Sequence, residues 1–272
     1  MLKIQKQNFS IKQICESGQC FRLNPVEKQK YSVIAFGKYL LLEETEKEIQ
    51  FYCSQEEYDS LWFDYFDLKT NYSRFIKSIP NQDRYLIQAA TFGAGIRILK
   101  QEVWEMIVSF IISQQNNIKR IKKSIELLCQ KFGEKKYFEN IVYYAFPSAE
   151  TLAQATQEEL NQCNLGYRSK YILKTAQSIV KKEMDITVLK NMSYEQAKTE
   201  LMKLYGVGKK VADCICLFGL HQLEAFPIDT HIKKALETNY QNQFPFESFQ
   251  GYEGVIQQYI FYYDLKNTVK IS

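Results

Sequence analysis

The spacing of hydrophobic positions changes character once along this chain, near residue 80. Residues 31–53, YSVIAFGKYLLLEETEKEIQFYC, alternate apolar and polar side chains and break at Gly37 and at the charged run EETEKE. Alternation with a period of two is typical of half-buried strands, and the breaks indicate turns, so this segment predicts an antiparallel meander. From about residue 82 onward the apolar positions recur with helical spacing, and the sequence predicts helices from there on.

Capping signals place the ends of several helices and indicate two domains. Serine or threonine followed three residues later by glutamate or glutamine begins a helix at Ser54–Glu57, Thr156–Glu159 and Ser193–Gln196. Glycines close predicted helices at residues 93, 133 and 166. We therefore predict an α+β protein, with an N-terminal antiparallel sheet domain carrying a few helices over residues 1–90 and a larger all-helical domain over residues 91–265. Residues 266–272 are candidates to return to the first domain.

Composition restricts the class of protein. The chain has 272 residues, of which 46% are hydrophobic and 24% charged, which is typical of a globular protein rather than a disordered one. No run approaches the roughly 18 uncharged apolar residues that a membrane span needs. The N-terminal stretch MLKIQKQNFSIKQ lacks the pattern of a secretory signal. We expect a monomer that is cytoplasmic in a prokaryote, or nuclear in a eukaryote.

Cysteine and charge content narrow the chemistry further. The seven cysteines are scattered and form neither a disulfide framework nor a CxxC pair, so reduced thiols are expected. The net charge of +4 permits an acidic partner such as nucleic acid without requiring one. There are 29 lysines but only six arginines, at positions 22, 74, 84, 97, 120 and 168. Because the planar guanidinium suits bidentate contacts, each arginine is a candidate for a specific role.

The stretch LYGVGKKVADCICLFG, residues 204–219, predicts two helices joined by a tight hairpin. Gly206 and Gly208 let the chain turn and leave backbone amides free at the start of the second helix. Such a helix start binds anions, because unpaired N–H groups and the helix dipole both favour negative charge. The structural alternative is that GVG only connects two packed helices.

The two lysines after the glycines differ on a helical wheel. Lys209 falls opposite the apolar face, one turn from Asp213, where an exposed ion pair is expected. Lys210 falls at the edge of the apolar face, one turn below Cys214. Partial burial at the positive end of a helix dipole favours the neutral amine, and a neutral lysine is a nucleophile. We therefore expect Lys209 to be a solvated charge and Lys210 to be the candidate nucleophile.

A carboxylate follows nineteen residues later, in FPIDTHIKKAL. Asp229 precedes a helix, so it is either its N-cap or a catalytic carboxylate beside Lys210 that stabilises a developing sugar cation and moves protons. His231 either orients one of these two side chains or is a hydrogen-bonded buried histidine.

At these residues the sequence resembles the helix-hairpin-helix DNA glycosylases, most closely their 8-oxoguanine DNA glycosylase branch. The resemblance continues, in the same order along the chain, in SGQCFR at 17–22, SFIISQQNNIKRI at 109–121, LGYRSKY at 165–171 and QQYIFYYDL at 257–265. It therefore covers nearly the whole chain, and the set of motifs is far more specific than any one of them.

The resemblance implies a role for each residue of a base pocket. Lys210 attacks C1′ of the damaged nucleotide, and Asp229 is the essential carboxylate. Gly18 offers its carbonyl to the N7 hydrogen that distinguishes 8-oxoguanine from guanine. Gln257 reads the pairing edge of the flipped base, and Phe261 stacks on it. Cys214 lines the other side of the pocket, where His231 is also placed.

A second group would hold the DNA and the opposite base. By resemblance, Tyr167 wedges into the base stack, while Arg120 and Arg168 face the orphaned cytosine. These assignments agree with the physical needs of base flipping, in which the enzyme extrudes the base and fills the hole. The full set comprises Gln115, Asn116, Asn117, Arg120, Tyr167, Arg168, Gly206, Gly208 and Lys209. Without the family match, Tyr167 and Arg168 are simply exposed, Phe261 is a core residue, and SGQ is an ordinary turn.

Two departures from the family pattern matter. The polar turn usually reads as three asparagines, whereas this chain has Gln115 at the hole-filling position, which puts strict cytosine preference in doubt. No cysteine follows Cys216, so an iron–sulfur cluster is not expected. No cofactor is implied, although the resemblance allows a monovalent cation at the hairpin carbonyls.

The sequence therefore predicts a bifunctional glycosylase and AP lyase acting on 8-oxoguanine in double-stranded DNA, through a lysine Schiff base and β-elimination. Two alternatives stay open. In the first, the chemistry is the same but the substrate is another oxidised purine, or 8-oxoguanine opposite any base. In the second, the protein is a non-catalytic helix-hairpin-helix module that only binds DNA.

Overall fold

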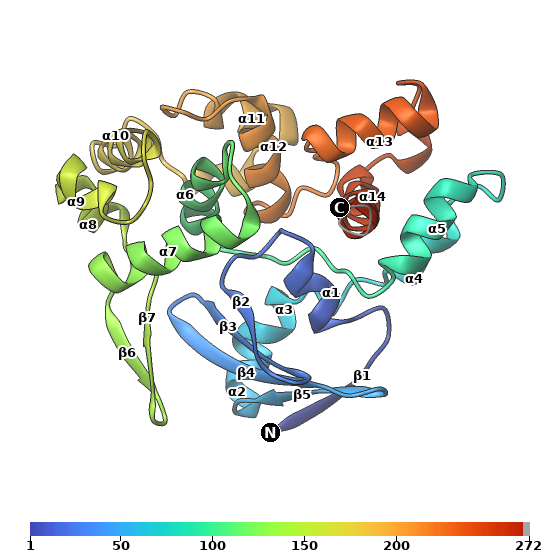
Figure 1. The fold of residues 1–272 in the computed structure, drawn as a ribbon, viewed down its shortest axis with the longest axis horizontal. Helices are drawn as coiled ribbons and strands as arrows, with labels where there is room; N and C mark the ends of the chain where they lie inside the picture. The colour runs from blue at the N-terminus through green and yellow to red at the C-terminus, as the bar shows by residue number, and fades with distance from the viewer. Residues whose placement is uncertain (269–272) are drawn as a thin grey trace.

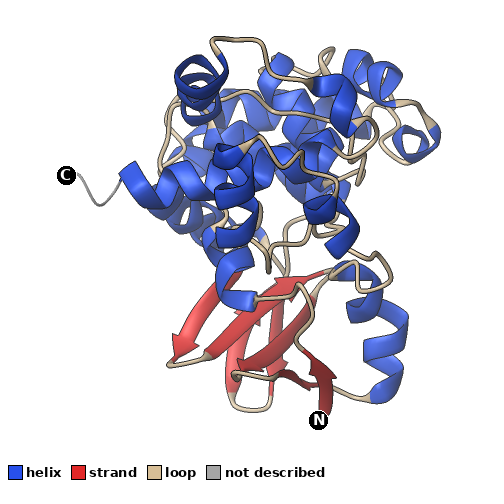
Figure 2. Ribbon diagram, turned by 90° about the vertical axis from the view of Figure 1, so that its right-hand side faces the viewer, coloured by secondary structure: helices blue, strands red, loops and turns tan. Residues whose placement is uncertain are grey.

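The computed structural model of the protein describes residues 1–268. An antiparallel sheet lies at one end of the molecule, and a larger body of helices lies at the other (Figures 1 and 2). The predicted α+β fold class is confirmed. The sheet has five strands in the order β1-β5-β4-β3-β2, with bounds β1 Leu2–Gln5, β2 Leu23–Glu27, β3 Lys30–Ala35, β4 Lys38–Glu44 and β5 Glu48–Tyr52.

The predicted meander is β3, β4 and β5, and its register follows the hydrophobic pattern. Val33 pairs with Leu40 and Leu42 pairs with Phe51, and none of these four side chains is exposed to solvent. Alternate residues of each strand therefore face one core. The two outer strands, β1 and β2, were not predicted, because each is short and β2 contains a proline.

The short helices of the first domain pack against the buried face of the sheet. After α1 (Ile11–Glu16), the segment that begins at Ser54 runs through α2 (Gln55–Glu57), the π-helical turn Tyr58–Trp62 and α3 (Phe63–Tyr65). Ser54 caps this segment by accepting from the Glu57 N–H at 3.1 Å. The Glu57 carboxylate accepts instead from the Trp62 indole N–H at 2.8 Å, so only half of the predicted capping box forms.

The helical body contains most of the remaining chain. Its elements are α4 Ser73–Lys77, α5 Arg84–Phe92, α6 Val103–Ser113, α7 Ile118–Phe132, α8 Ala149–Gln154, α9 Gln157–Asn161, α10 Arg168–Val180, the 3₁₀ turn Val188–Asn191, α11 Tyr194–Leu201, α12 Lys209–Phe218, α13 Thr230–Tyr240, the 3₁₀ turn Phe246–Phe249 and α14 Glu253–Thr268. Helix α6 is buried along nearly its whole length. It lies beside α12, which carries the two lysines (Figure 1).

The prediction of helix throughout this part of the chain is wrong at residues 135–144. There β6 (Lys135–Phe138) and β7 (Ile141–Tyr144) form an antiparallel hairpin that projects alongside the sheet (Figure 1). Its side chains pack on the first domain, where the Phe138 and Tyr39 rings stack with centroids 4.9 Å apart. Aromatic and β-branched residues favour strands when a neighbouring surface covers them, and this tertiary contact has no signal in the local sequence.

Two hydrophobic cores lie on either side of the sheet–helix junction. The smaller one comprises side chains from Phe9 to Phe66, with Leu99. The larger one includes Phe75 of α4 and Leu86 of α5, so these side chains pack with the helical body although they precede residue 90. The domain boundary predicted at residue 90 stays a prediction.

The C-terminal helix contacts the first domain near its end. Lys266 lies in α14, and its Nζ is 2.8 Å from a carboxylate oxygen of Glu16 in α1. The rest of the segment expected to return to the first domain, residues 269–272, lies outside the described residues.

Two findings concern the expectations drawn from composition. All seven cysteines are free thiols, as predicted. Within residues 1–268, no helix is long and apolar enough to cross a membrane.

Two ionisable residues, one from each part of the chain, are buried. Arg22, just before β2, and Glu105, in α6, are 3% and 5% exposed. The Arg22 guanidinium donates to the Tyr144 carbonyl, while its Nε and Nη1 have no partner among the described residues. Burial raises the pKa of Glu105 to about 7, although Arg22 opposes the shift and Glu102 adds to it.

We predict that Glu105 makes stability fall as the pH rises. Between about pH 4.5 and 7 the folded state keeps a proton that the unfolded chain has lost, so the free energy of unfolding decreases by roughly 3 kcal/mol over this window. Glu105→Gln removes this titration. The free energy of unfolding of the variant should therefore fall less between pH 5 and pH 8 than that of the wild-type protein, by about 3 kcal/mol. Urea unfolding at both pH values measures the difference, with the exposed Glu158→Gln as control. An equal decline in Glu105→Gln would contradict the assignment.

Candidate active site

The predicted helix-hairpin-helix is formed by α11 and α12, joined by residues 202–208. Gly206 has a φ of +86°, and a Cβ there would lie 2.4 Å from the Tyr171 ring, so this position requires glycine. Gly208 has an extended backbone, and a Cβ there would meet nothing within 4 Å. Gly208 therefore leaves the start of α12 open to a ligand rather than fitting a tight turn.

The two lysines at the start of α12 differ in exposure, as the helical wheel predicted. Lys209 is exposed, while Lys210 is half-buried. The Lys210 Nζ lies 5.7 Å from the centroid of the Phe110 ring in α6. Only the second lysine is therefore placed in the interior.

The expected exposed pair between Lys209 and Asp213 is wrong. Asp213 is 4% exposed. Its Oδ1 lies 2.7 Å from the Lys198 Nζ and 2.7 Å from the Tyr194 hydroxyl, both on α11. Helix α11 therefore covers this side of α12, and Asp213 holds the two helices of the hairpin together.

The charge state of Lys210 also differs from the expectation. Burial is the largest single influence on its pKa and lowers it. Cys214 and the Asp229 carboxylate favour the ammonium, and the pKa of Lys210 lies above its ordinary value. The expectation of a neutral amine in the resting protein is therefore wrong, because the surroundings that desolvate Lys210 also supply its counter-charge. Burial raises the pKa of Cys214 to about 11, so its thiol is neutral near pH 7.

Asp229 occupies the position that both of its predicted roles require. It is the N-cap of α13, and its Oδ1 accepts from the Ile232 N–H at 2.9 Å. It also lines the cavity that holds Lys210. Capping uses one carboxylate oxygen, so the structural role leaves the negative charge of Asp229 in place beside the lysine.

Six of the predicted catalytic and pocket residues line one small cavity. They come from four separate parts of the chain and are Gly18, Lys210, Cys214, Asp229, Gln257 and Phe261. His231 is the exception. Its Nδ1 lies 2.8 Å from Asp264, and its ring meets Phe261 edge-on with centroids 5.7 Å apart. In this structure His231 therefore supports Phe261 rather than lining the cavity.

The cavity is small, and the Phe261 ring forms part of its wall. Its volume is about 50 Å³, room for one or two water molecules. Gly18 has a φ of +74°, and a Cβ there would lie 3.2 Å from Phe261 Cε1. The phenyl ring therefore packs directly on the Gly18 backbone. A planar base can enter only if this ring moves away from Gly18.

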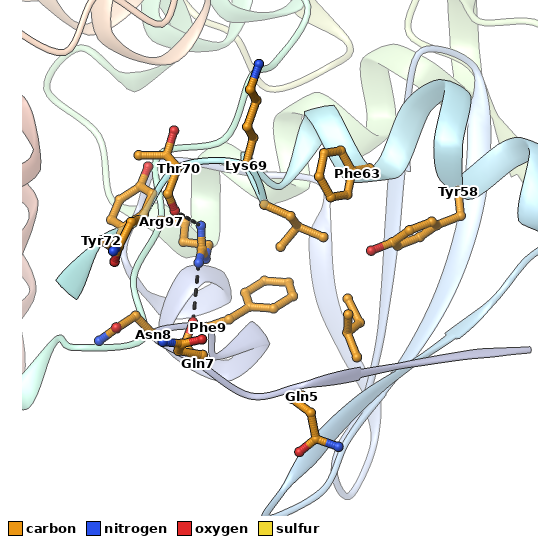
Figure 3. A pocket seen from close by; sticks show the side chains of 13 residues that line it. Gln5, Gln7, Asn8, Phe9, Tyr58, Phe63, Lys69, Thr70, Tyr72 and Arg97 are labelled. Atoms are coloured by element: carbon orange, nitrogen blue, oxygen red, sulfur yellow. Dashed lines mark hydrogen bonds between the residues drawn. The ribbon is translucent and has the colours of Figure 1, made fainter. Parts of the chain in front are cut away.

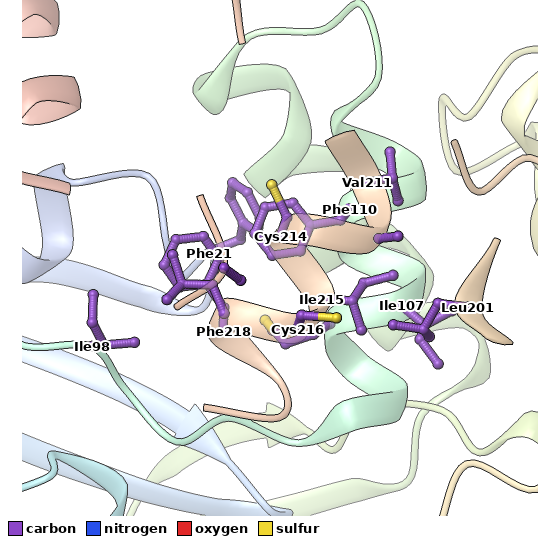
Figure 4. Close-up of a cluster of buried hydrophobic side chains, with 14 of the residues drawn as sticks. Phe21, Ile98, Ile107, Phe110, Leu201, Val211, Cys214, Ile215, Cys216 and Phe218 are labelled. Carbon is purple, nitrogen blue, oxygen red and sulfur yellow. The ribbon is translucent and has the colours of Figure 1, made fainter. Parts of the chain in front are cut away.

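Five residues of the cavity were not predicted, namely Ser17, Phe110, Phe218, Pro227 and Gln258. The Phe110 and Phe218 rings stack with centroids 5.4 Å apart and lie beside Cys214 (Figure 4). In sequence both phenylalanines look like ordinary core positions of α6 and α12. Only the crossing of these helices brings them to the cavity wall.

The residues expected to face the opposite base gather at the turn between α6 and α7. Gln115 is exposed with a φ of +45°. Asn117 caps α7 by accepting from the Arg120 N–H at 2.9 Å, and Arg120 is itself exposed. Tyr167, 47% exposed, lies across from this turn, with its hydroxyl 3.5 Å from the Gln114 carbonyl. The turn and the tyrosine therefore form one surface.

Arg168 is held more firmly than expected. It is 7% exposed, and its guanidinium donates to the backbone carbonyls of Gln114, Gln115 and Leu165. Gln114 in turn donates from its Nε2 to the Gly206 carbonyl at 3.0 Å. Gln114, which the sequence did not single out, thus links the turn to the hairpin. Most of the Arg168 donors are therefore engaged with backbone carbonyls in this structure.

A larger cavity of about 380 Å³ lies in the N-terminal domain (Figure 3). Its arginine, Arg97, donates to the backbone carbonyls of Asp67, Thr70 and Gln7. Arg97 thus ties three chain segments together. None of the predicted site residues lines this cavity, so the larger space is not where the candidate chemistry lies.

The two parts of the chain match two family models. Residues 1–107 match the 8-oxoguanine DNA glycosylase N-terminal domain, and residues 108–243 match the helix-hairpin-helix superfamily of base excision DNA repair proteins. The N-glycosylase/DNA lyase of Saccharomyces cerevisiae is 33% identical, over 88% of this chain and 70% of that protein. That of Arabidopsis thaliana is 27% identical, over 88% and 68%.

Solved structures match over nearly the full length. The Clostridium acetobutylicum 8-oxoguanine glycosylase/lyase in complex with double-stranded DNA containing cytosine opposite 8-oxoguanine superposes with a TM-score of 0.92. It is 35% identical over 98% of this chain and 99% of that one. The apo form of the same enzyme gives a TM-score of 0.89 over 97% and 99%, also at 35% identity.

Proposed function

This chain belongs to the 8-oxoguanine DNA glycosylase branch of the helix-hairpin-helix superfamily, and from that premise we propose the roles of its cavity residues. The protein is a bifunctional DNA glycosylase and AP lyase that acts on 8-oxoguanine. The observation that carries the residue assignment is the cavity itself, where Lys210 and Asp229 meet Gly18, Gln257 and Phe261. The non-catalytic alternative is set aside.

Base entry is the first step. DNA binds across the hairpin, where Gly208 and the exposed Lys209 meet a phosphate. The damaged nucleotide turns out of the stack, Gln115 fills the hole, and Tyr167 wedges into the base stack. Phe261 moves off Gly18 and stacks on the base, which frees the Gly18 carbonyl to accept from the N7 hydrogen. The small resting cavity supports this order, because the base and the resting position of Phe261 exclude each other.

The chemical step needs the amine of Lys210 in its neutral form. Lys210 rests as an ammonium, and Asp229 is the carboxylate among the cavity-lining residues. Asp229 therefore holds the lysine in place and then stabilises the positive charge that develops on the sugar. One ammonium proton first passes from Lys210 to Asp229, and the neutral Nζ then bonds to C1′ as the bond from C1′ to the base breaks. The base leaves with the electron pair and takes up that proton from Asp229. The nitrogen next loses one proton, the C1′–O4′ bond breaks as O4′ takes up a proton, and the protonated Schiff base forms.

Strand cleavage follows from the Schiff base. Removal of a proton from C2′ drives breakage of the C3′–O bond, so the strand is cut on the 3′ side of the lesion, and hydrolysis releases Lys210. Asp229 is the group placed to accept protons in this cavity.

Recognition of the opposite base is the finer part of the proposal. Arg120 is already exposed, and Arg168 becomes available when the carbonyls of residues 114 and 115 move on DNA binding. Both guanidinium groups then face cytosine. Gln115 is longer than asparagine and tolerates other opposite bases better.

Borohydride trapping tests the proposal directly. Borohydride reduces the Schiff base and leaves the protein covalently attached to DNA. With 8-oxoguanine duplexes that differ only in the opposite base, we expect an adduct in each case, formed fastest opposite cytosine. Undamaged duplex is the control and should give none. Tight binding of the 8-oxoguanine duplex without any adduct would refute the catalytic role.

A further inference from the structure

Two adjacent glutamines of α14 reach the cavity, and only the first has a role in the proposal above. Gln257 and Gln258 are each 3% exposed, and both line the cavity. The Gln257 Nε2 donates to the Pro227 carbonyl at 3.0 Å, and the Gln258 Nε2 donates to the Gln257 Oε1 at 3.1 Å. The Gln258 Oε1 is buried without a partner among the described residues.

The Pro227 carbonyl determines the orientation of both amides. A carbonyl only accepts, so Gln257 has to present its NH₂ to Pro227 and its oxygen to Gln258. Gln258 then has to present its NH₂ to that oxygen. Reversing either amide would place two acceptors against each other. The remaining Gln258 oxygen is therefore an acceptor by necessity, and leaving it unpaired costs free energy in the resting protein.

A count of donors and acceptors indicates what this oxygen binds. The pairing edge of a guanine-type base carries two adjacent donors, the N1 hydrogen and the 2-amino group. The Gln257 oxygen can accept twice, and Gln258 already occupies one of those positions. One donor of the base thus pairs with Gln257, and the other needs a second acceptor in the same cavity.

We propose that Gln258 is a specificity-determining residue whose Oε1 accepts from the 2-amino group of the flipped purine, while its Nε2 holds Gln257 in the orientation that reads N1. This rests on the proposed role of Gln257. It gives the protein a preference for oxidised guanine over oxidised purines that lack a 2-amino group. An adenine-type base, which presents no donor at C2, leaves the Gln258 oxygen buried and unpaired.

The test compares two bases that differ only in this group. Duplexes carry 8-oxoguanine or 8-oxohypoxanthine, which lacks the 2-amino group, each opposite cytosine. Single-turnover rates over a range of protein concentrations give the rate constant divided by the dissociation constant. We expect wild-type protein to favour 8-oxoguanine by at least about tenfold, and Gln258→Met to lower this ratio severalfold, mostly through loss on 8-oxoguanine.

A matched control lies on the same helix. Tyr259 is fully buried, and its hydroxyl also has no partner among the described residues, but Tyr259 does not line the cavity. Tyr259→Phe should keep the wild-type ratio. If Gln258→Met does not fold, Gln258→Glu carries the comparison. Only its protonated carboxyl can donate to Gln257, so its excision rate should recover as the pH is lowered.

The outcomes separate this inference from the proposed function. Wild-type protein that does not excise 8-oxoguanine would refute the proposed function. The wild-type protein could excise 8-oxoguanine while Gln258→Met keeps the wild-type preference for 8-oxoguanine over 8-oxohypoxanthine. That result would overturn this inference alone, and the neighbouring Pro227 carbonyl would then be the second acceptor. Equal loss on both bases would show that Gln258 only supports the helix.

Discussion

Lys210→Gln should abolish both borohydride trapping and base release, with a loss of at least about 10³-fold in the single-turnover rate. Lys210 supplies the attacking nitrogen, and the amide that replaces it is not a nucleophile. Glutamine is close to lysine in length and fits the half-buried site, so the variant should fold and bind duplex DNA. Rates on an 8-oxoguanine duplex, together with circular dichroism, measure the two properties separately.

Lys209→Gln is the matched control, because it changes the adjacent residue of the same helix. Lys209 is exposed and does not line the cavity. The control should lower DNA affinity, reduce the dependence of affinity on salt, and leave the rate at saturating protein unchanged. The reverse pattern, with trapping lost in Lys209→Gln and retained in Lys210→Gln, would place the nucleophile on the other lysine.

Asp229→Asn should give a folded protein whose turnover is lower by about 10²–10³-fold. Asparagine caps a helix about as well as aspartate, so the bond to the Ile232 N–H survives while the negative charge beside Lys210 is lost. Asp229→Ala should lose the cap as well and destabilise the protein by a further ~1 kcal/mol. Urea unfolding and single-turnover rates on both variants separate capping from catalysis.

The two readings of Asp229 then make opposite predictions for the asparagine variant. If Asp229 served only as a cap, Asp229→Asn would keep nearly full activity and only Asp229→Ala would be impaired. Failure of Asp229→Asn to fold would likewise favour the structural role.

The sequence correctly predicted much of the local secondary structure. The alternation over residues 31–53 predicted three strands with the correct faces, and the Thr156 and Ser193 caps begin α9 and α11 as expected. These features depend on neighbours within a few residues, so the local pattern contains the necessary information. The hairpin β6–β7 was missed because it is stabilised by contact with Tyr39, a hundred residues away in the chain.

The failures at the candidate site share a different physical cause. Asp213 was expected at the surface, yet α11 buries it. Lys210 was expected to be neutral, yet the Asp229 carboxylate in the same cavity favours its ammonium form. Helical spacing predicts which face of a helix a residue occupies. It does not predict which element covers that face, and the charge state of a buried group depends on those neighbours.

The sequence by itself determined the fold class, the family, the hairpin and the split between Lys209 and Lys210, because each depends on order and spacing along the chain. Only the tertiary structure decided that Phe261 packs on Gly18 in the resting cavity and that Arg168 is held by the turn at residues 114–115. It also decided that Gln258 donates to Gln257 and keeps a buried oxygen without a partner among the described residues. Those properties arise where segments far apart in sequence pack together, and a hydrogen bond or a steric contact exists only once both partners are in place.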